Sequence, residues 1–208
     1  MKTKILIIGG GGHARSVADI ALEGGKFDIM GFIDCKRGDV LGVPVIGNDD
    51  DLERLYDSGI KSAFVALGEN KLRSKLFFKL RSIGFEFVNI ISVNAHISKR
   101  AILGTGICVM AGAVVNVNTV IGDNSIINTN CSIDHDCHIG RDCHIAPGVS
   151  MSGTVTVGDG AHIGTGSNVI DGLSIGSWSY IGAGAAVVND IPERALAYGV
   201  PARIIRNL

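Results

Sequence analysis

Between residues 131 and 144 lies the densest group of side chains able to do chemistry, with three cysteines and three histidines among three aspartates. Thiolate and imidazole groups are the ligands that zinc prefers, so composition alone suggests a metal site. A second chemistry is available at His135, which has Asp134 and Asp136 on either side. A neighbouring carboxylate holds the tautomer of an imidazole and raises its basicity. The segment therefore predicts either metal binding or a general base with a pKa near neutrality, as acyl transfer to an amine or a hydroxyl requires.

A glycine-rich turn near the start of the chain could hold a phosphate group. A β-branched run over residues 4–8 is followed by Gly9-x-Gly11-x-x-Ala14 and a helical pattern, and Asp34 follows twenty residues after Ala14. This order formally fits the dinucleotide fingerprint. Glycines allow close backbone approach, and a helix N-terminus favours an anion. Because a repeat begins near Ile91 where a second βαβ half would be needed, the pattern favours a nucleotide-sugar over a dinucleotide.

The elements that position residues 131–144 follow from a six-residue repeat. Every sixth residue from Ile91 to Val187 is aliphatic or Met, at seventeen consecutive positions. Glycine follows the aliphatic residue at positions 104, 122, 140, 158 and 176, each eighteen after the last, so three hexapeptides make one coil. The repeat predicts a triangular β-solenoid in which the aliphatic residues point inward and neighbouring coils pair at about 4.8 Å.

The phase of this repeat argues against zinc. Cys131, Cys137 and Cys143 each precede an inward aliphatic residue by two, in a slot for small side chains, on three successive faces of one coil. They point at separate corners, and the histidines lack the pair with four residues between that the zinc-dependent solenoid carbonic anhydrases carry. The sequence therefore predicts no metal. The remaining histidines are expected on outward faces, where His144 and His162, one coil apart, could line a ligand groove.

Alternating strand and helix patterns fill the chain before the repeat. Leu72, Leu76 and Leu80 at spacing four, with Gly84 as a C-cap, predict the last helix of this region. The alternation predicts a small parallel sheet covered by helices. The other expected elements are strands at residues 4–8, 30–34 and 62–67 and helices at residues 14–22 and 51–56.

The overall composition excludes several classes of protein. Nineteen basic and twenty acidic residues give a net charge of −1, without the basic excess of nucleic-acid or anionic-membrane binders. No stretch approaches the roughly 18 apolar residues of a membrane span, and the first apolar run is too short for a signal peptide. Five cysteines, an odd number, favour reduced thiols. We therefore expect a soluble, cytoplasmic protein that binds no nucleic acid and has no membrane span.

The repeat resembles the left-handed β-helix of the bacterial hexapeptide acyltransferases. Nearly the whole chain resembles the sugar O-/N-acyltransferases of the sialic-acid O-acetyltransferase and bacillosamine-pathway type, in which a small nucleotide-sugar domain precedes the repeat. The motifs that carry the resemblance lie at residues 9–15, 31–34, 42–47, 126–129, 134–140, 144–148 and 199–203.

This resemblance implies a fold of two classes joined in one chain. An α/β, Rossmann-like half domain that binds a nucleotide-sugar is expected over residues 1–88. A left-handed parallel β-helix with acyltransferase activity is expected over residues 89–190, followed by a C-terminal tail over residues 191–208.

The resemblance also assigns roles in the repeat. In the family, the histidine of the His-Asp/Glu-Cys-x-Ile-Gly motif is the general base, which matches His135 with Asp136 as the acid that raises its basicity. Acetyl then passes directly from acetyl-CoA to the acceptor. The pantetheine arm lies in a groove between neighbouring subunits of a homotrimer, at positions that match His144, Thr165 and Ala183. Asn128 either positions the acceptor or is a turn asparagine.

In the first domain the resemblance implies a binding site for the nucleotide-sugar. Cys35 stands where nucleoside-binding relatives carry a second Asp, and this departs from their uracil recognition. The implied contacts are Gly12, His13 and Ala14 to the diphosphate-sugar, Asp34 and Cys35 to the base, and Gly68 to the far side.

Together these features predict an acetyl-CoA-dependent N-acetyltransferase that acts on the 4-amino group of a nucleotide-linked sugar, in surface-glycan or glycoprotein-sugar synthesis. An alternative is O-acetylation of sialic acid or another sugar hydroxyl. A rival of another class is a non-catalytic solenoid scaffold that senses a nucleotide through residues 1–88. Turnover of acetyl-CoA with thiol release on a panel of sugars separates these classes.

Overall fold

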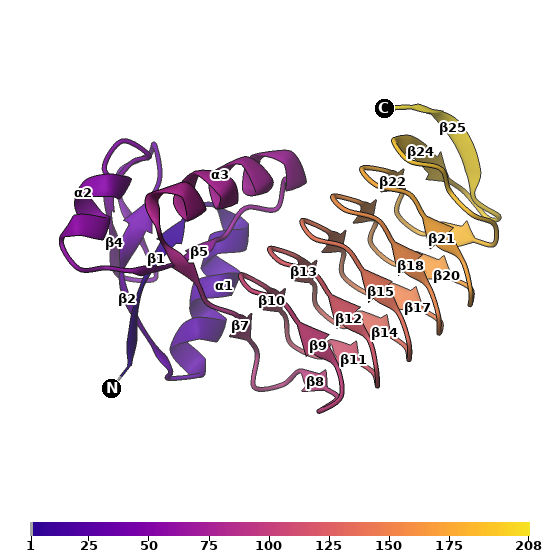
Figure 1. Cartoon of the computed structure of the whole chain (residues 1–208), viewed down its shortest axis with the longest axis horizontal. Helices are drawn as coiled ribbons and strands as arrows, with labels where there is room; N and C mark the ends of the chain where they lie inside the picture. The colour runs from indigo at the N-terminus through magenta and orange to yellow at the C-terminus, as the bar shows by residue number, and fades with distance from the viewer. Residues whose placement is uncertain (1) are drawn as a thin grey trace. The chain divides into compact units, whose positions relative to one another are not determined.

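The computed structural model describes residues 2–208 and divides the chain into two compact units, Met1–Val93 and Asn94–Leu208 (Figure 1). The first unit is an α/β domain, and the second is a stack of triangular coils. The predicted order of a Rossmann-like half domain followed by a left-handed parallel β-helix is confirmed.

The first unit is built on a six-stranded sheet in the order β3-β4-β2-β1-β5-β6. All neighbours are parallel except β3 and β4, which form an antiparallel hairpin that the sequence did not predict. The central strand β1 carries Ile5–Ile8, almost fully buried, as expected of a parallel strand covered on both faces. The strands of this unit are β1 (Thr3–Ile8), β2 (Phe27–Ile33), β3 (Asp39–Val40), β4 (Val43–Gly47), β5 (Ser62–Val65), β6 (Glu86–Phe87) and β7 (Ile90–Ile91).

The order of these strands creates a crevice at one edge of the sheet. β1 pairs with β2 on one side and with β5 on the other, so the chain winds away from β1 in opposite directions. In open α/β sheets, ligands bind at such a switch point, outside the carboxyl ends of the strands. The glycine turn after β1, Asp34 after β2 and Gly68 after β5 all lie at this edge.

Three helices accompany the sheet: α1 (Gly12–Glu23), α2 (Leu52–Asp57) and α3 (Asn70–Ile83). Glu69 caps α3 by accepting the N–H groups of Lys71 and Leu72, and Gly84 ends it at φ 110°, as predicted. The predicted leucine row is only partly buried, because Leu72 is 46% exposed. With 3.6 residues per turn, a spacing of four drifts around the helix, and Arg73 and Phe77 take the inner positions instead.

The second unit contains sixteen two-residue strands and a terminal pair of longer ones. From β8 to β23, each strand residue pairs in parallel with the strand residue eighteen positions later, for example Ile127 with Ile145 and Ile145 with Ile163. In the last coil the separation is sixteen, since Tyr180 pairs with Leu196. The strands are β8 (His96–Ile97), β9 (Ile102–Leu103), β10 (Cys108–Val109), β11 (Val114–Val115), β12 (Val120–Ile121), β13 (Ile126–Ile127), β14 (Ser132–Ile133), β15 (His138–Ile139), β16 (His144–Ile145), β17 (Ser150–Met151), β18 (Thr156–Val157), β19 (His162–Ile163), β20 (Asn168–Val169), β21 (Ser174–Ile175), β22 (Tyr180–Ile181), β23 (Ala186–Val187), β24 (Ala195–Tyr198) and β25 (Arg203–Asn207).

These strands form the three flat faces of the predicted triangle. One face runs β8-β11-β14-β17-β20-β23, a second runs β9-β12-β15-β18-β21, and the third contains β10-β13-β16-β19-β22-β24. β25 pairs antiparallel with β24 and ends the stack. Each face is one strand of every coil, so a residue's place in the hexapeptide fixes the face or corner on which it lies.

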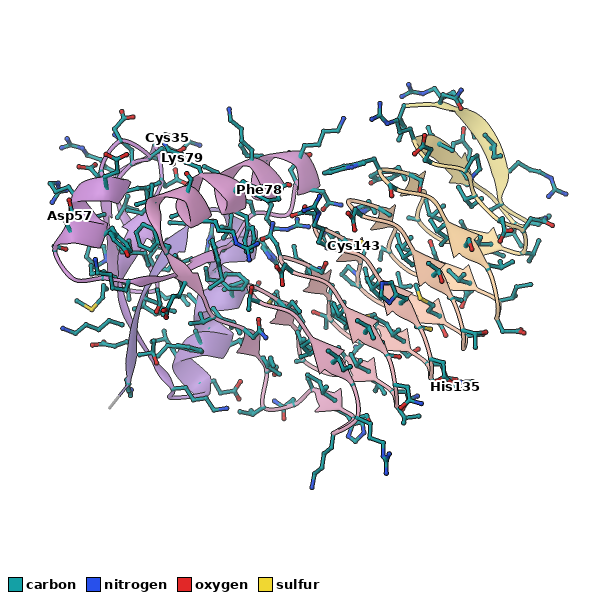
Figure 2. All side chains as sticks on the ribbon, viewed as in Figure 1. Cys35, Asp57, Phe78, Lys79, His135 and Cys143 are labelled. Carbon is teal, nitrogen blue, oxygen red and sulfur yellow. The ribbon has the colours of Figure 1, made fainter. Side chains whose placement is uncertain are left out.

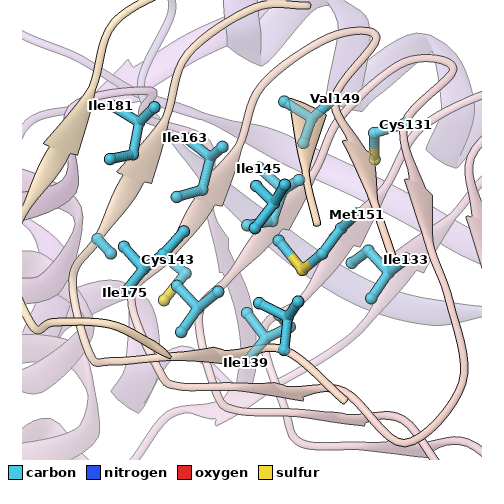
Figure 3. Packing of buried hydrophobic residues seen from close by; sticks show 14 of the residues in the cluster. Cys131, Ile133, Ile139, Cys143, Ile145, Val149, Met151, Ile163, Ile175 and Ile181 are labelled. Carbon is cyan, nitrogen blue, oxygen red and sulfur yellow. The ribbon is translucent and has the colours of Figure 1, made fainter. Parts of the chain in front are cut away.

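The interior of the coils is a column of aliphatic side chains (Figure 3). Ile133, Ile139, Ile145 and Ile163 are fully buried, and the small slots beside them are filled by residues such as Cys131. The prediction of an inward row fails at its beginning: Ile97 and Leu103 are half-buried, and Ile91 belongs to the first unit and is 36% exposed. The first coil has no coil before it in its own unit to cover these positions.

The corners account for part of the high glycine content of the chain, 29 of 208 residues. Each corner needs a residue in the left-handed region, which glycine adopts without strain and which Asn and Asp tolerate better than other residues. The solenoid corners use Gly112, Gly148, Gly160, Gly166, Gly172 and Gly184 at φ 68–72° and Asn118, Asn124, Asn130, Asp136 and Asp142 at φ 55–59°.

Candidate active site

His135 and Asp136 form a hydrogen-bonded pair at one corner of the solenoid. They lie in the turn between β14 and β15, at the outer edge of the coil stack (Figure 2). Nδ1 of His135 is 2.9 Å from Oδ2 of Asp136, and about half of each side chain is exposed. Because an ionised carboxylate only accepts hydrogen bonds, Nδ1 carries the proton and Nε2 keeps its lone pair.

This pairing makes His135 more basic. The hydrogen bond with Asp136 is the largest cause and raises the pKa of His135. Desolvation, the next largest cause, lowers this pKa, and the charges of Asp134 and Asp136 raise it further. An exposed imidazole with a raised pKa and a fixed tautomer can accept a proton at Nε2, as a general base does.

The imidazole of His135 lies over Gly153 of the following coil. A Cβ atom at position 153 would stand 2.5 Å from Cε1 and 2.7 Å from Nε2 of the ring. The backbone of the corner is held from both neighbouring coils, since Thr154 N–H donates to the His135 carbonyl at 2.9 Å and Asp136 N–H donates to the Val117 carbonyl at 3.0 Å. The position of the ring therefore depends on the absence of a side chain at Gly153.

Asn128 and His144 form a second polar pair. Nδ2 of Asn128 is 3.0 Å from Nε2 of His144, and Oδ1 of Asn128 accepts the N–H of Thr129 at 2.8 Å. The second bond fixes the orientation of the amide, so its nitrogen faces the imidazole. Nε2 of His144 then accepts, and Nδ1 carries the proton in the neutral ring.

His144 begins a short stack of rings along one face of the solenoid. Its ring centroid is 4.8 Å from that of His162 in an edge-on arrangement, and His162 lies parallel to Tyr180 at 4.3 Å. The three residues occupy the first positions of β16, β19 and β22. The prediction that His144 and His162 share a face one coil apart is confirmed.

The residues predicted to bind the pantetheine arm lie along one edge of the solenoid. Thr165 follows β19 and Ala183 follows β22, and both are exposed. The carbonyl of Thr165 accepts the N–H of Gly184 at 2.8 Å, so these corners are joined directly. Asn128, which follows β13, belongs to the same edge two coils before Thr165.

Within one chain the structure does not bring this edge to His135. His135 lies in the turn from the β14 face to the β15 face, whereas Asn128, Thr165 and Ala183 lie in the turns that leave the β13, β19 and β22 face. The two sets occupy different corners of the triangle, separated by a strand and its turn. The predicted base and the predicted cofactor residues therefore lie apart within one chain.

The cysteines of this segment contact separate carbonyl groups. The thiol of Cys137 donates to the Ser152 carbonyl at 3.2 Å, and that of Cys143 donates to the Gly158 carbonyl at 3.2 Å. Burial raises the pKa of Cys131 to about 12, which keeps this thiol protonated. Over residues 2–208 there is no group of three His, Cys, Asp or Glu side chains that could hold a metal ion.

In the first unit, Asp34 closes the glycine turn. Its Oδ2 accepts the N–H of Gly10 at 2.7 Å and its Oδ1 accepts the N–H of Lys36 at 2.9 Å. The backbone N–H of Lys36 is the largest cause that lowers the pKa of Asp34. Cys35 is exposed beside it, with Sγ 3.5 Å from Oδ1 of Asp34. The structure thus joins two strand ends that the sequence separates by more than twenty residues.

The glycines of this turn leave space that the protein itself does not fill. A Cβ atom at Gly11, Gly12 or Gly68 would meet no atom within 4 Å. Gly11 is the N-cap of α1, which therefore has no side chain to bond the first N–H groups of the helix. The N-terminus of this twelve-residue helix carries a partial positive charge, which favours an anionic ligand.

Two cavities meet at Asp34. A cavity of about 400 Å³ is lined by the glycine turn and by three basic residues, Arg15, Lys36 and Arg37. A cavity of about 310 Å³ lies towards β4 and is lined by Asp34, Cys35, Val45 and Asp51, among others. These three basic residues were not predicted from the sequence to line a site, although the Lys-Arg doublet directly after Cys35 is a usable signal.

His13 and Arg73 lie behind this turn. Desolvation, followed by the charge of Arg73, lowers the pKa of His13 to about 4, so its ring is neutral. Arg73 is 1% exposed and donates through Nη1 to the carbonyls of Leu67 at 3.0 Å and Gly68 at 3.3 Å. The loop that ends β5 is therefore held by a buried cation from α3.

Two family models match parts of the chain. The PglD N-terminal domain matches residues 4–80, and the bacterial transferase hexapeptide family, with six repeats, matches residues 118–153. The first match covers the glycine turn and all of the sheet except β6, and the second includes the His135 corner.

Solved structures match almost the whole chain. A His-to-Asn mutant of perosamine N-acetyltransferase from Caulobacter crescentus, in complex with CoA and GDP-perosamine, is 43% identical over 98% of this chain and 97% of its own, with a TM-score of 0.95. The acetyltransferase domain of PglB from Neisseria gonorrhoeae is 36% identical over 98% of this chain and 100% of its own, with a TM-score of 0.94. WeeI from Acinetobacter baumannii is 26% identical over 98% of this chain and 100% of its own, with a TM-score of 0.87.

A curated relative is far longer than this chain. An uncharacterized protein of Acanthamoeba polyphaga mimivirus is 35% identical over 104 residues, which are 49% of this chain and 20% of that protein. The chain thus matches about a fifth of that relative's length and shares no stated activity with it.

The fold and these comparisons define a hexapeptide-repeat acyltransferase with a PglD-type N-terminal domain. The chain belongs to the PglD-like family of acetyl-CoA-dependent sugar N-acetyltransferases, and the family expected from the sequence is confirmed. None of the helices within residues 2–208 has the length and apolar character needed to cross a membrane.

Proposed function

We propose that the protein transfers the acetyl group of acetyl-CoA to the 4-amino group of a nucleotide-linked sugar, with His135 as general base and Asp136 as its partner. The observation that carries this proposal is the His135–Asp136 pair, in which Nδ1 is 2.9 Å from the carboxylate. The chain that holds this pair is 43% identical to a perosamine N-acetyltransferase. Forms of that enzyme with a histidine replaced by Asn or Ala were crystallised with CoA and GDP-perosamine, which supports a central role for a histidine.

The proposed reaction is a single direct transfer. The 4-amino nitrogen attacks the carbonyl carbon of the thioester, a C–N bond forms, the C–S bond breaks, and CoA leaves as a thiolate. The nitrogen loses a proton to Nε2 of His135, and Asp136 stabilises the resulting imidazolium through Nδ1–H. The proton then passes to the thiolate or to water, which restores the neutral base. No Ser or Cys nucleophile takes part.

The first unit holds the nucleotide-sugar in this proposal. Gly12, His13 and Ala14 contact the diphosphate at the N-terminus of α1, where the open space at Gly12 supports a close approach of the phosphates. Arg15, Lys36 and Arg37 add positive charge to the same cavity.

We assign the nucleoside to the cavity that Asp34 and Cys35 line towards β4, and the far side of the ligand to Gly68. A guanosine nucleotide is favoured over a uridine nucleotide. The chain is 43% identical to an enzyme crystallised with GDP-perosamine, and Cys35 stands where uracil-binding members carry an Asp.

The second unit binds acetyl-CoA in this proposal. His144, Thr165 and Ala183 contact its pantetheine arm, and Asn128 positions the acceptor beside it. The small exposed side chains of Thr165 and Ala183 suit contacts made through the backbone. A relative 35% identical over 99% of this chain was solved with acetyl coenzyme A, which supports this donor.

We also propose a homotrimer, which the separation of His135 from the predicted cofactor residues supports. A triangular solenoid has three edges, and in a trimer the His135 corner of one copy can face the edge with Asn128 and His144 of the next. Such an arrangement completes one site at each of three interfaces. We also propose that residues 1–88 form the nucleotide-sugar domain and residues 89–190 the acyltransferase domain, with residues 191–208 as a tail, and that the enzyme works in the cytoplasm, where acetyl-CoA is available.

The test is an acceptor panel with the purified full chain and acetyl-CoA. GDP-perosamine, a UDP-linked 4-amino sugar and sialic acid are compared by thiol release and by mass spectrometry of the product, with His135→Ala as the control. We expect turnover with the amino sugars and faster turnover with the GDP-linked one. Turnover with sialic acid alone would replace the assignment with O-acetylation, and nucleotide binding without any thiol release would make the protein a nucleotide-sensing scaffold. A mass of 21.7 kDa by light scattering at micromolar concentration would remove the trimer.

A further inference from the structure

The carboxylate of Asp136 has a second partner besides His135. Asn118 lies one coil earlier at the same corner, and its Nδ2 donates to Oδ1 of Asp136 at 3.0 Å. The other oxygen, Oδ2, faces Nδ1 of His135 at 2.9 Å. The carboxylate is therefore held at both oxygens and cannot rotate without breaking one of these bonds.

We propose that Asn118 is a positioning residue for the general base: its amide fixes the plane of the Asp136 carboxylate so that Oδ2 stays directed at Nδ1 of His135. Asn118 contacts neither substrate in this account and acts only through Asp136. The proposal rests on the acetyl transfer proposed above for His135.

The chemistry of the three groups allows one arrangement of protons. An ionised carboxylate only accepts, so the NH₂ edge of Asn118 must face Asp136, and its carbonyl oxygen is turned away. The same carboxylate requires a proton on Nδ1 of His135. Two donors thus converge on Asp136, and Nε2 of His135 is left with the lone pair that accepts the proton of the attacking amine.

The electrostatics of the corner agree with this geometry. The hydrogen bond from Asn118 is the largest cause that lowers the pKa of Asp136, and the hydrogen bond with Asp136 is the largest cause that raises the pKa of His135. The other titratable groups on the turn that carries His135 and Asp136 are Asp134 and Cys137. Desolvation raises the pKa of the Cys137 thiol. The facing turns contribute no titratable side chain, since they consist of Asn116, Val117 and Asn118 before and of Ser152, Gly153 and Thr154 after.

A purely structural role for Asn118 is the alternative that the test must exclude. Asn124 and Asp142 form the same ladder at another corner, with Nδ2 2.6 Å from Oδ1 across eighteen residues. Both asparagines have a left-handed backbone, at φ 59° and φ 58°. Such ladders can hold neighbouring coils together without any catalytic histidine. Loss of stability in an Asn118 variant therefore does not distinguish a positioning role from a structural one.

The first experiment measures the pKa of His135 directly and does not depend on enzymatic activity. Asn118→Gly keeps a left-handed backbone and removes only the amide, and NMR titration follows Cε1–H of His135 in the wild type and the variant. We expect the titration midpoint of His135 to move to lower pH, because an unrestrained carboxylate bonds Nδ1 less well. Asn118→Asp places a second carboxylate at the site and should move the midpoint to higher pH. This shift would establish that the titration of His135 responds to a charge at position 118. An unchanged or raised midpoint in Asn118→Gly would overturn the proposal.

The second experiment is a double-mutant cycle on turnover. Asn118→Gly should lower kcat by about three- to tenfold, the range expected for one ordinary hydrogen bond, and leave KM for acetyl-CoA near its wild-type value. In an Asp136→Gly background the same substitution should cost nothing further, because Asn118 then has no carboxylate to hold. Equal losses in both backgrounds would assign Asn118 a structural role.

The matched control is Asn130→Gly. Asn130 is an exposed asparagine with φ 55° at another corner and is not bonded to a catalytic carboxylate. This variant should leave the His135 titration unchanged, and a shift as large as that of Asn118→Gly would overturn the proposal. If the wild type transfers acetyl to no acceptor, the proposed function fails, and the His135 titration still decides whether Asn118 orients the pair.

Discussion

Two histidines, one in each unit, have pKa values displaced in opposite directions. His13 lies behind the glycine turn, where desolvation and the nearby charge of Arg73 lower its pKa to about 4. His135 lies at an exposed corner, where the bond to Asp136 raises its pKa. The packed α/β unit thus holds a neutral ring, and the solenoid presents a basic one to solvent. The difference shows that position in the fold, rather than residue type, decides which histidine can exchange protons with a substrate.

Replacement of His135 should have the largest effect on activity. Replacement by Ala should lower kcat by roughly 10²–10⁴-fold and leave acetyl-CoA binding nearly intact, because a positioned base contributes about this much to the chemical step. Asp136→Asn should cost less, since the imidazole remains without its partner. Steady-state kinetics and direct binding of acetyl-CoA measure both effects. Near-normal kcat in His135→Ala, with loss of activity in His144→Ala, would exchange the roles of the two histidines.

The wild-type activity should also depend on pH through His135. The base works only when neutral, so kcat/KM should fall as pH drops through the raised pKa of His135. In Asp136→Asn the acidic limb should move to lower pH, because the largest cause of the upward shift is removed. A pH profile of kcat/KM for both proteins checks this.

His13 should make the first unit less stable in acid. Its folded pKa of about 4 lies below the ordinary histidine value of 6.5, so its neutral form stabilises the fold fully above pH 6.5. As pH falls from 6.5 towards 4, the unfolded chain takes up a proton that the folded chain does not, and stability drops by up to about 3 kcal/mol. Urea unfolding of the wild type and His13→Gln across this range should give a steeper loss in the wild type. Parallel pH dependences would remove His13 as the cause.

A substitution at Gly153 tests whether activity depends on the position of the His135 ring. Gly153→Ala places a methyl group where the ring lies, 2.5 Å from Cε1, so the imidazole must move from its present position. Because misplacement of a catalytic group by about 1 Å can cost up to 10²-fold, we expect kcat to fall by at least about tenfold. The His135→Ala background provides the control, since there the same substitution should have little further effect. Equal losses in the two backgrounds would show that Gly153 acts independently of the ring.

The smallest effects are expected at the cysteines. Cys35 is exposed, whereas Cys108, Cys131, Cys137 and Cys143 are buried, so a thiol reagent should modify one cysteine quickly in the native protein and four only after unfolding. Cys137→Ala should keep most of the activity, because the thiol only fills a small slot and donates to the Ser152 carbonyl. Stoichiometric zinc by elemental analysis, lost together with activity on chelation, would contradict the structural role of these residues.

Much of this molecule follows from the order of its residues. The six-residue period assigned inward positions such as Ile133 and Ile145, small slots such as that of Cys131, and the exposed corner of His135, because every coil repeats the same backbone. The same period places Asn118 eighteen residues before Asp136. In the first unit, the apolar run before the glycine turn and Gly84 after the last helix correctly indicated β1 and the end of α3, since both signals are local.

Other features were decided only by tertiary structure. The neutral state of His13 depends first on its burial and then on the charge of Arg73, sixty residues later on another helix, and no local pattern indicates either. The basic lining of the cavity at Asp34 arises where two strand ends meet, and the short β3–β4 hairpin has too few residues to show a period. The second oxygen of Asp136 meets the Asn118 amide because the corner turns both side chains to the same side. Periodicity fixes where backbones lie, but the distances between side-chain atoms arise from packing of segments that are far apart in the chain.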